Sequence, residues 1–235
     1  MKKSLFLFPV FLLFLGGCFA PLNLTYESAR TVNKGEIELQ GNYSKYYYTR
    51  PFNSNGSINL NNNIGIKIGY GITDRYTMKV RYERLKWNPD LKIDVIDSNK
   101  FFDLSVFNSL NVNCFEIENK FKFKHANVAI GIPLGYYNYN ILREGSAGYF
   151  IVDPRVYLTL FSSTNIFELS FIPKVHIIIF DDLNFYPAPA FSIGLGLSSN
   201  LKKWVLRPEF GFDGIFSYGV GLNINLNNVI NLKND

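Results

Sequence analysis

Cysteine, histidine and charge are all scarce in this sequence, and each scarcity excludes a class of function. Two cysteines and two histidines stand among 235 residues, and only 18% of the residues are charged. Without clustered Cys, His or carboxylate ligands, we predict no metal site, no cofactor site and no catalytic residues. A net charge of +5 without a long basic run predicts no nucleic-acid interface.

Long hydrophobic runs are also missing. A transmembrane helix needs about 20 apolar residues, and the N-terminal run Leu5–Leu15 is well below that length. Lys2 and Lys3 precede this run, which is the pattern of a signal peptide and predicts export from the cytoplasm. The tetrapeptide Leu15-Gly16-Gly17-Cys18 follows at once and resembles a bacterial lipobox.

The lipobox resemblance implies that residues 1–17 are removed as a signal peptide and that Cys18 is acylated. Ordinary cleavage after Ala20 is the alternative. With Cys18 acylated, Cys114 is the one remaining thiol, so no internal disulfide is predicted. The polar, unpatterned stretch up to Lys34 is interpreted as part of a lipidated tether, residues 18–34, which precedes a domain of residues 35–235.

From Gly35 onward, uncharged side chains recur at every second position. Alternation with a period of two predicts β-strands, and no helical period of comparable length competes with it. We therefore predict an all-β protein with about ten strands. The runs are Ile37–Tyr43, Ile64–Tyr70, Tyr76–Tyr82, Phe115–Phe123, Val128–Leu134, Val152–Leu160, Phe167–Ile179, Phe191–Leu197, Trp204–Phe210 and Phe216–Leu226.

The charged side chains gather on the opposite face of these strands. Two geometries fit one apolar and one charged face. A soluble sandwich or lipocalin turns the apolar face inward, whereas an outer-membrane barrel turns it outward to lipid. The connections favour the barrel, because short turns near residues 72–75, 125–127, 162–165 and 198–203 alternate with mostly longer connections. Such alternation is typical of the periplasmic and extracellular ends of a closed antiparallel up-and-down transmembrane β-barrel.

Aromatic residues, 17% of the chain, collect near the predicted strand ends, as interfacial belts require. The outer belt is expected at Tyr46, Tyr47, Tyr48, Trp87, Tyr136, Tyr137, Tyr149, Phe150, Phe180 and Phe216, and the inner belt at Tyr70, Tyr76, Phe123, Phe161, Phe167 and Trp204.

Two short segments strengthen this interpretation. Residues 28–36, Ser-Ala-Arg-Thr-Val-Asn-Lys-Gly-Glu, lead into the first strand, and residues 70–75, Tyr-Gly-Ile-Thr-Asp-Arg, form the first short turn. Both resemble segments of small bacterial outer-membrane β-barrel proteins, including barrel lipoproteins. The resemblance implies an exported protein held in the outer membrane.

Three prolines and one segment do not fit the pattern. Pro154, Pro173 and Pro208 fall inside predicted strands, where a closed barrel has no edge to accommodate a missing N–H, so bulges or strand ends are expected there. Residues 101–113 keep no clean phase, and we predict no structure for the connection 86–111.

Barrels of eight to ten strands are filled by side chains, so we expect a lumen closed by paired charges. A narrow polar conduit is the alternative. The predicted lumen charges are Lys67, Lys79, Arg81, Glu116, Glu118, Lys120, Lys122, Arg155, Glu168, Arg207 and Glu209.

Catalysis is not predicted. Lipid-hydrolysing outer-membrane barrels use a His-x-Ser pair, whereas His176 is followed by two isoleucines and His125 lies in a predicted turn. We expect a monomeric outer-membrane barrel lipoprotein with a structural or surface-binding role, whose partner is membrane lipid and which has no cofactor. The alternatives are a tethered, soluble, lipocalin-like carrier of an apolar ligand and a narrow solute channel.

Overall fold

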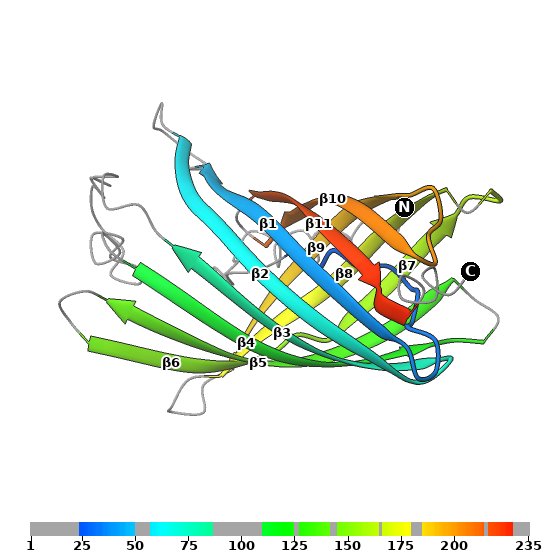
Figure 1. Ribbon diagram of the computed structural model, residues 1–235. Helices are drawn as coiled ribbons and strands as arrows, with labels where there is room; N and C mark the ends of the chain where they lie inside the picture. The colour runs from blue at the N-terminus through cyan, green and yellow to red at the C-terminus, as the bar shows by residue number, and fades with distance from the viewer. Residues whose placement is uncertain are drawn as a thin grey trace, which may run out of the picture.

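The computed structural model describes residues 24–49, 57–86, 110–124, 127–141, 145–164, 166–179, 185–213 and 216–227 (Figure 1). Its strands are β1 (Ile37–Thr49), β2 (Ser57–Thr73), β3 (Tyr76–Lys86), β4 (Leu110–Lys122), β5 (Val128–Ile141), β6 (Gly145–Val152), β7 (Arg155–Phe161), β8 (Phe167–Ile179), β9 (Phe185–Leu197), β10 (Trp204–Phe212) and β11 (Phe216–Asn225). No described helix is long and apolar enough to cross a bilayer.

The strands form one closed antiparallel barrel, which confirms the predicted fold class. Apart from β6 and β7, each strand pairs with its neighbour in the chain, and β1 pairs with β11 to close the ring. β6 and β7 are two parts of one strand, because both lie between β5 and β8 and the register does not change across the break. Val152 faces Leu134 and Arg155 faces Gly131, three residues further along each strand. The barrel therefore has ten strands.

The prolines lie where the hydrogen-bond ladder is weakest. Pro154 separates β6 from β7, although the Asp153 N–H still donates to the Pro133 carbonyl at 3.1 Å. Pairing of β10 with β9 is interrupted at Arg207 and Pro208, whereas pairing with β11 continues through both residues. Loss of one N–H on one side of a strand is thus compensated by an intact ladder on the other side.

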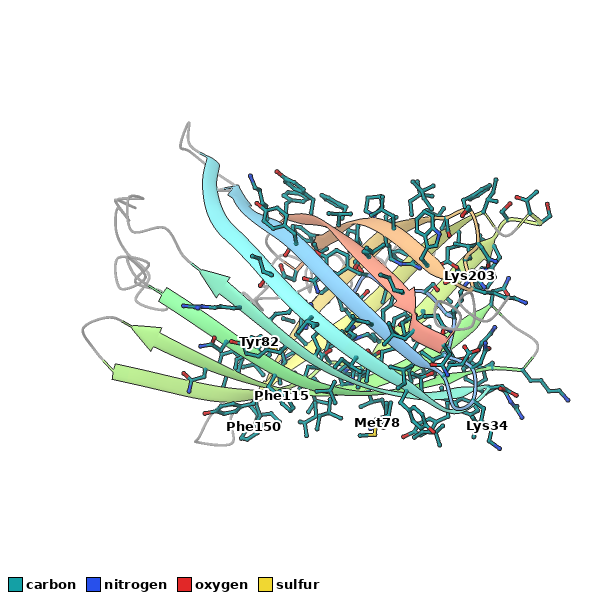
Figure 2. All side chains as sticks on the ribbon, viewed as in Figure 1. Lys34, Met78, Tyr82, Phe115, Phe150 and Lys203 are labelled. Carbon is teal, nitrogen blue, oxygen red and sulfur yellow. The ribbon has the colours of Figure 1, made fainter. Side chains whose placement is uncertain are left out.

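The two faces of the sheet are oriented as in a membrane barrel. Ile66 and Phe115 have exposed fractions of 47% and 48%, whereas Lys79 and Glu118 have 3% and 1%. Figure 2 shows Met78, Phe115 and Phe150 on the outer surface. A soluble carrier would bury the apolar side chains instead, so this orientation excludes the lipocalin-like alternative.

The short turns gather at one end of the barrel, called here the turn end. It carries the β2–β3, β4–β5, β7–β8 and β9–β10 connections (Figure 1), and both Lys34 and Lys203 lie there (Figure 2). The opposite end is called the loop end. The connection at residues 87–109 lies outside the described residues.

Two residues expected in the outer aromatic belt point the other way. Tyr137 and Tyr149 are buried inside the barrel, and their rings stack with centroids 5.2 Å apart. Tyr136 and Phe150, their neighbours in the chain, are exposed on the outer surface. In a strand successive side chains point to opposite faces, so only one member of each adjacent aromatic pair can face lipid.

The N-terminal part of the described chain is not a free tether. Residues 24–32, called here the inner segment, lie within the ring of strands (Figure 1), and Leu24, Thr25, Tyr26 and Glu27 are fully or almost fully buried. This corrects the interpretation of residues 24–34 as part of a tether. A polar, unpatterned sequence suits a polar lumen as well as it suits solvent, which is why the sequence pattern was misleading. Residues 18–23, with Cys18, lie outside the described residues.

Candidate functional site

Three lysines from adjacent strands meet one carboxylate of the inner segment. Lys67 on β2, Lys79 on β3 and Lys120 on β4 all point into the lumen. Successive side chains of a strand point to opposite faces of the sheet, and these three occupy inward positions. Their Nζ atoms lie 2.5, 3.3 and 2.7 Å from the Glu27 carboxylate oxygens. Lys79 also pairs with Glu38 at 2.9 Å. The inner segment is thereby bound to the β2–β4 side of the wall.

The three lysines keep Glu27 ionised. Burial by itself raises the pKa of the Glu27 carboxyl, but the combined charges of Lys120, Lys67 and Lys79 hold that pKa well below its ordinary value. The carboxylate is therefore charged at neutral pH, and its removal would leave buried ammonium groups without their main partner. Breaking a buried ion pair from one side costs about 3–5 kcal/mol.

The main chain of the inner segment is bound by side chains of the barrel wall. Glu209 accepts from the N–H groups of Thr25 and Tyr26 at 2.7 and 2.5 Å. Gln40 donates to the Thr25 carbonyl at 3.3 Å, Arg81 to the Leu24 carbonyl at 2.7 Å, and Asn223 to the Tyr26 carbonyl at 3.2 Å. Buried backbone groups need such partners, and here four different strands supply them.

Towards the turn end the contacts continue. The N–H of Ala29 donates to Thr159 Oγ1 at 2.8 Å, and that of Val32 donates to Thr77 Oγ1 at 2.9 Å. Arg30 pairs with Glu168 at 2.6 Å. The arginine therefore binds the wall across the lumen from the lysines that hold Glu27.

Glycines shape the wall around Tyr26. A methyl group at Gly221 would overlap the Cβ and ring of Tyr26, and one at Gly219 would overlap its hydroxyl. Tyr26 itself has φ of 56°, in the left-handed region that non-glycine residues rarely adopt. Such a conformation persists only where the surroundings impose it, so the wall and the inner segment fit each other closely.

A second charge cluster fills the lumen nearer the loop end. Arg155 pairs with Asp153 at 2.6 Å and with Glu116 at 3.0 Å. Asp153 also lies 3.4 Å from His176 Nδ1, and Arg81 pairs with Glu83. His176 thus belongs to a buried polar cluster.

Two adjacent cavities lie beside the inner segment. The larger, of about 160 Å³, is at the turn end and is lined among others by Arg30, Glu38, Lys122 and Lys203. The smaller, of about 30 Å³, is lined by Glu27, Lys79 and Lys120 and shares Arg30 and Glu38 with the first. The lysine cluster therefore borders a small void that lies next to the cavity at the turn end.

The structure places the sequence-derived lumen residues as follows. Ten are buried inside the barrel: Lys67, Lys79, Arg81, Glu116, Glu118, Lys120, Arg155, Glu168, Arg207 and Glu209. Lys122 is half-buried at the turn end, with its Nζ 5.8 Å from the centre of the Phe161 ring. Sequence reasoning missed Glu27 and Arg30, because neither belongs to an alternating run. Within the described residues, no group of three His, Cys, Asp or Glu side chains could hold a metal ion.

Comparison with known proteins supports the fold and gives no closer relationship. No protein family matches the sequence, and no curated protein is similar to it. An outer-membrane channel from Pseudomonas putida F1 is similar in structure, with a TM-score of 0.50, 11% identity, and coverage of 88% of this chain and 100% of that one. The chain therefore has the fold of a small outer-membrane β-barrel.

More distant structural neighbours are of the same kind. The N-terminal barrel domain of Pseudomonas aeruginosa OprF has a TM-score of 0.35 and 12% identity, covering 82% of this chain and 98% of that one. The attachment invasion locus protein of Yersinia pestis has a TM-score of 0.34 and 9% identity, with coverage of 82% and 97%.

Proposed function

We propose that this protein is an outer-membrane β-barrel lipoprotein whose lumen is closed by its own N-terminal segment. Its role is structural, or it is a surface-binding protein that presents the connections of the loop end. It acts as a monomer, without catalysis, and Cys18 carries its lipid anchor. The observation that carries the proposal is the Glu27 carboxylate held by Lys67, Lys79 and Lys120 inside the barrel.

The outer surface supports the membrane location. Large apolar side chains cover the outward positions of every long strand, among them Ile68, Leu134, Phe171 and Leu206. A soluble monomer rarely exposes an apolar patch of that extent. Contact with lipid acyl chains removes this surface from water, and a closed ring leaves no strand edge unpaired in the membrane.

The inner segment supports a closed lumen. It crosses the space between the basic β2–β4 side and Glu168 and Glu209 on the opposite side, and both sides bind it. A free conduit would leave those wall charges to water or ions. Here they are satisfied by the chain itself.

A narrow solute channel is the second candidate. The observation in its favour is the pair of adjacent cavities that lie between the turn end and the side chains of Lys79 and Lys120. In this case the inner segment would restrict the passage without closing it.

Single-channel recording in planar bilayers distinguishes the two candidates. The plugged barrel predicts no steady conductance for the wild-type protein, and openings at least about tenfold more frequent for Glu27→Lys, because a fourth ammonium would repel the other three. Glu36→Gln is the matched control, since Glu36 lies at the turn end and accepts hydrogen bonds from Asn33 and Asn225 without contacting these lysines. Steady conductance of the wild-type protein would contradict the plugged barrel and support the channel.

A further inference from the structure

The lumen recognises a peptide main chain. Seven backbone groups of the inner segment are bound by wall side chains: the carbonyls of Leu24, Thr25 and Tyr26, and the N–H groups of Thr25, Tyr26, Ala29 and Val32. Contacts of this kind depend on the path of the chain and not on its side chains. Any peptide that followed the same path would find the same partners.

Side-chain contacts add a preference to this general recognition. The glycines at positions 219 and 221 leave room for an aromatic ring, three lysines receive an acidic residue, and Glu168 receives a basic one. Tyr26, Glu27 and Arg30 occupy these places in the chain's own segment. The wall therefore selects an aromatic residue followed by an acidic one, with a basic residue three positions further on.

The close fit of the inner segment to the wall has an energetic cost. Tyr26 has to adopt a left-handed backbone conformation to place both its ring and its main-chain groups, and this conformation is unfavourable for a residue with a Cβ. Loss of the segment from the lumen would release that strain. The strain therefore lowers the net binding energy of any occupant that places a residue with a Cβ at this position, the cis segment included.

The turn end offers a route for a competitor. The smaller cavity is lined by Glu27, Lys79 and Lys120 together, and it lies next to the larger cavity at the barrel mouth, with which it shares the lining residues Arg30 and Glu38. Displacement of the Arg30 and Glu38 side chains would join the two cavities and open Lys79 and Lys120 to an incoming carboxylate. Exchange would begin there, with release of Arg30 from Glu168.

From these observations we infer that the lumen is a binding site for a peptide with this pattern of an aromatic, an acidic and a basic residue. The inner segment is its occupant in cis, and a peptide of the same chemistry entering from the turn end replaces it. This inference rests on the proposed function, because it requires that the inner segment closes the lumen. To the proposed function the inference adds the class of ligand that would open the lumen.

Binding of a labelled synthetic peptide tests the inference. The probe is a fluorescent peptide with the sequence of residues 24–32, and fluorescence anisotropy is measured with the full-length protein folded in detergent. A tethered segment competes at an effective concentration of about millimolar or higher, so the wild-type protein should bind the probe weakly. Glu27→Lys weakens the cis occupant and should bind the probe at least about tenfold more tightly.

Two controls make the result specific. The same peptide with lysine in place of its glutamate should not bind to the Glu27→Lys protein, and adding Lys120→Gln to that protein should reduce its affinity for the original peptide. Glu27→Gln, a milder change, gives a second weakened occupant in case Glu27→Lys does not fold, as judged by heat-modifiable migration on gels.

The outcomes separate the two proposals. If folded Glu27→Lys protein conducts ions but does not bind the probe, the peptide site is refuted while the plugged barrel stands. Equal binding of the original and the lysine-containing peptide would also refute the site. If the folded variant neither conducts nor binds, both proposals are wrong.

Discussion

Lys120 donates a hydrogen bond to Glu27 at 2.7 Å, although 93 residues separate the two in the chain. This contact joins the inner segment, which precedes β1, to β4. In the barrel β4 lies three strands away from β1. The lumen is therefore built from both the wall and the N-terminal segment.

Glu27→Gln should destabilise the folded barrel. The substitution keeps the shape of the side chain but removes the charge that compensates Lys67, Lys79 and Lys120. We expect a loss of about 3–5 kcal/mol, the usual cost of breaking a buried ion pair from one side. Urea titration in lipid vesicles, followed by heat-modifiable migration, measures the change. Glu36→Gln should change stability by less than about 1 kcal/mol, and an equal loss in both variants would show that the lysine cluster has no special role.

The contribution of Glu27 to stability should depend on pH in one direction. Its pKa is lowered in the folded state, so its contribution is fully present above the unfolded pKa and is lost as pH falls through the lowered folded value. The difference in stability between the wild-type and Glu27→Gln proteins should stay constant from about pH 8 to about pH 5 and shrink in stronger acid. Urea titrations across this range check it. A difference that falls between pH 8 and pH 6 would contradict the predicted direction of the shift.

Gly221→Ala should destabilise the protein through Tyr26. The added methyl group would overlap the tyrosine, and overpacking of this kind costs about 1–3 kcal/mol. Combined with Tyr26→Gly, the same substitution should cost much less, so a double-mutant cycle should show clear coupling. Gly194→Ala is the matched control, because its methyl group would meet no atom closer than 3.4 Å. Additive effects of Gly221→Ala and Tyr26→Gly would show that the ring does not lie against β11.

Lysine substitutions on the outer surface should report depth in the membrane. Ile66 lies within β2, whereas Ile72 lies next to the β2–β3 turn, and both are exposed. Ile66→Lys should cost about 2–4 kcal/mol in vesicles and Ile72→Lys about 0–1 kcal/mol, because the cost falls towards the interface. Folding titrations in lipid vesicles give both values. Equal costs would contradict a membrane-spanning orientation of β2.

Cys18→Ser should abolish lipid attachment. If the resemblance of residues 15–18 to a lipobox is functional, cells grown with a labelled fatty acid should label the wild-type protein and not the variant. Cys114→Ser is the control, since Cys114 is buried inside the barrel and should not affect labelling. Labelled Cys18→Ser protein would refute the anchor.

The barrel could be predicted because its pattern is local. Ile66, Lys67 and Ile68 follow one another in β2, so a period of two assigns each side chain to lipid or lumen once the orientation is known. The short turns at Asp74 and near Asn200 also helped, because a short turn predicts that the two strands it joins are adjacent and antiparallel. The break between β6 and β7 at Pro154 could also be predicted, because proline lacks the N–H that a ladder of hydrogen bonds between strands requires.

The inner segment could not be predicted because its partners are distant. Thr25 and Tyr26 bind Glu209, and Arg30 binds Glu168, across more than a hundred residues of sequence. A segment whose main chain is bound by side chains, and not by the hydrogen-bond ladder of a sheet, shows no regular alternation of apolar and polar residues. Glu27 therefore looked like one charge in a polar linker, and only the arrangement of Lys67, Lys79 and Lys120 around it revealed its role.

The closing pair of strands, β1 and β11, has a consequence for biogenesis. Asn223 on β11 donates to the carbonyl of Tyr26, 197 residues earlier in the chain, and Gln40 on β1 donates to that of Thr25. Residues 25 and 26 are thus bound by both strands of the closing pair, the first and the last of the described strands. Pairing of β1 with β11 encloses residues 24–32, so the inner segment has to enter the lumen before the ring of strands is complete.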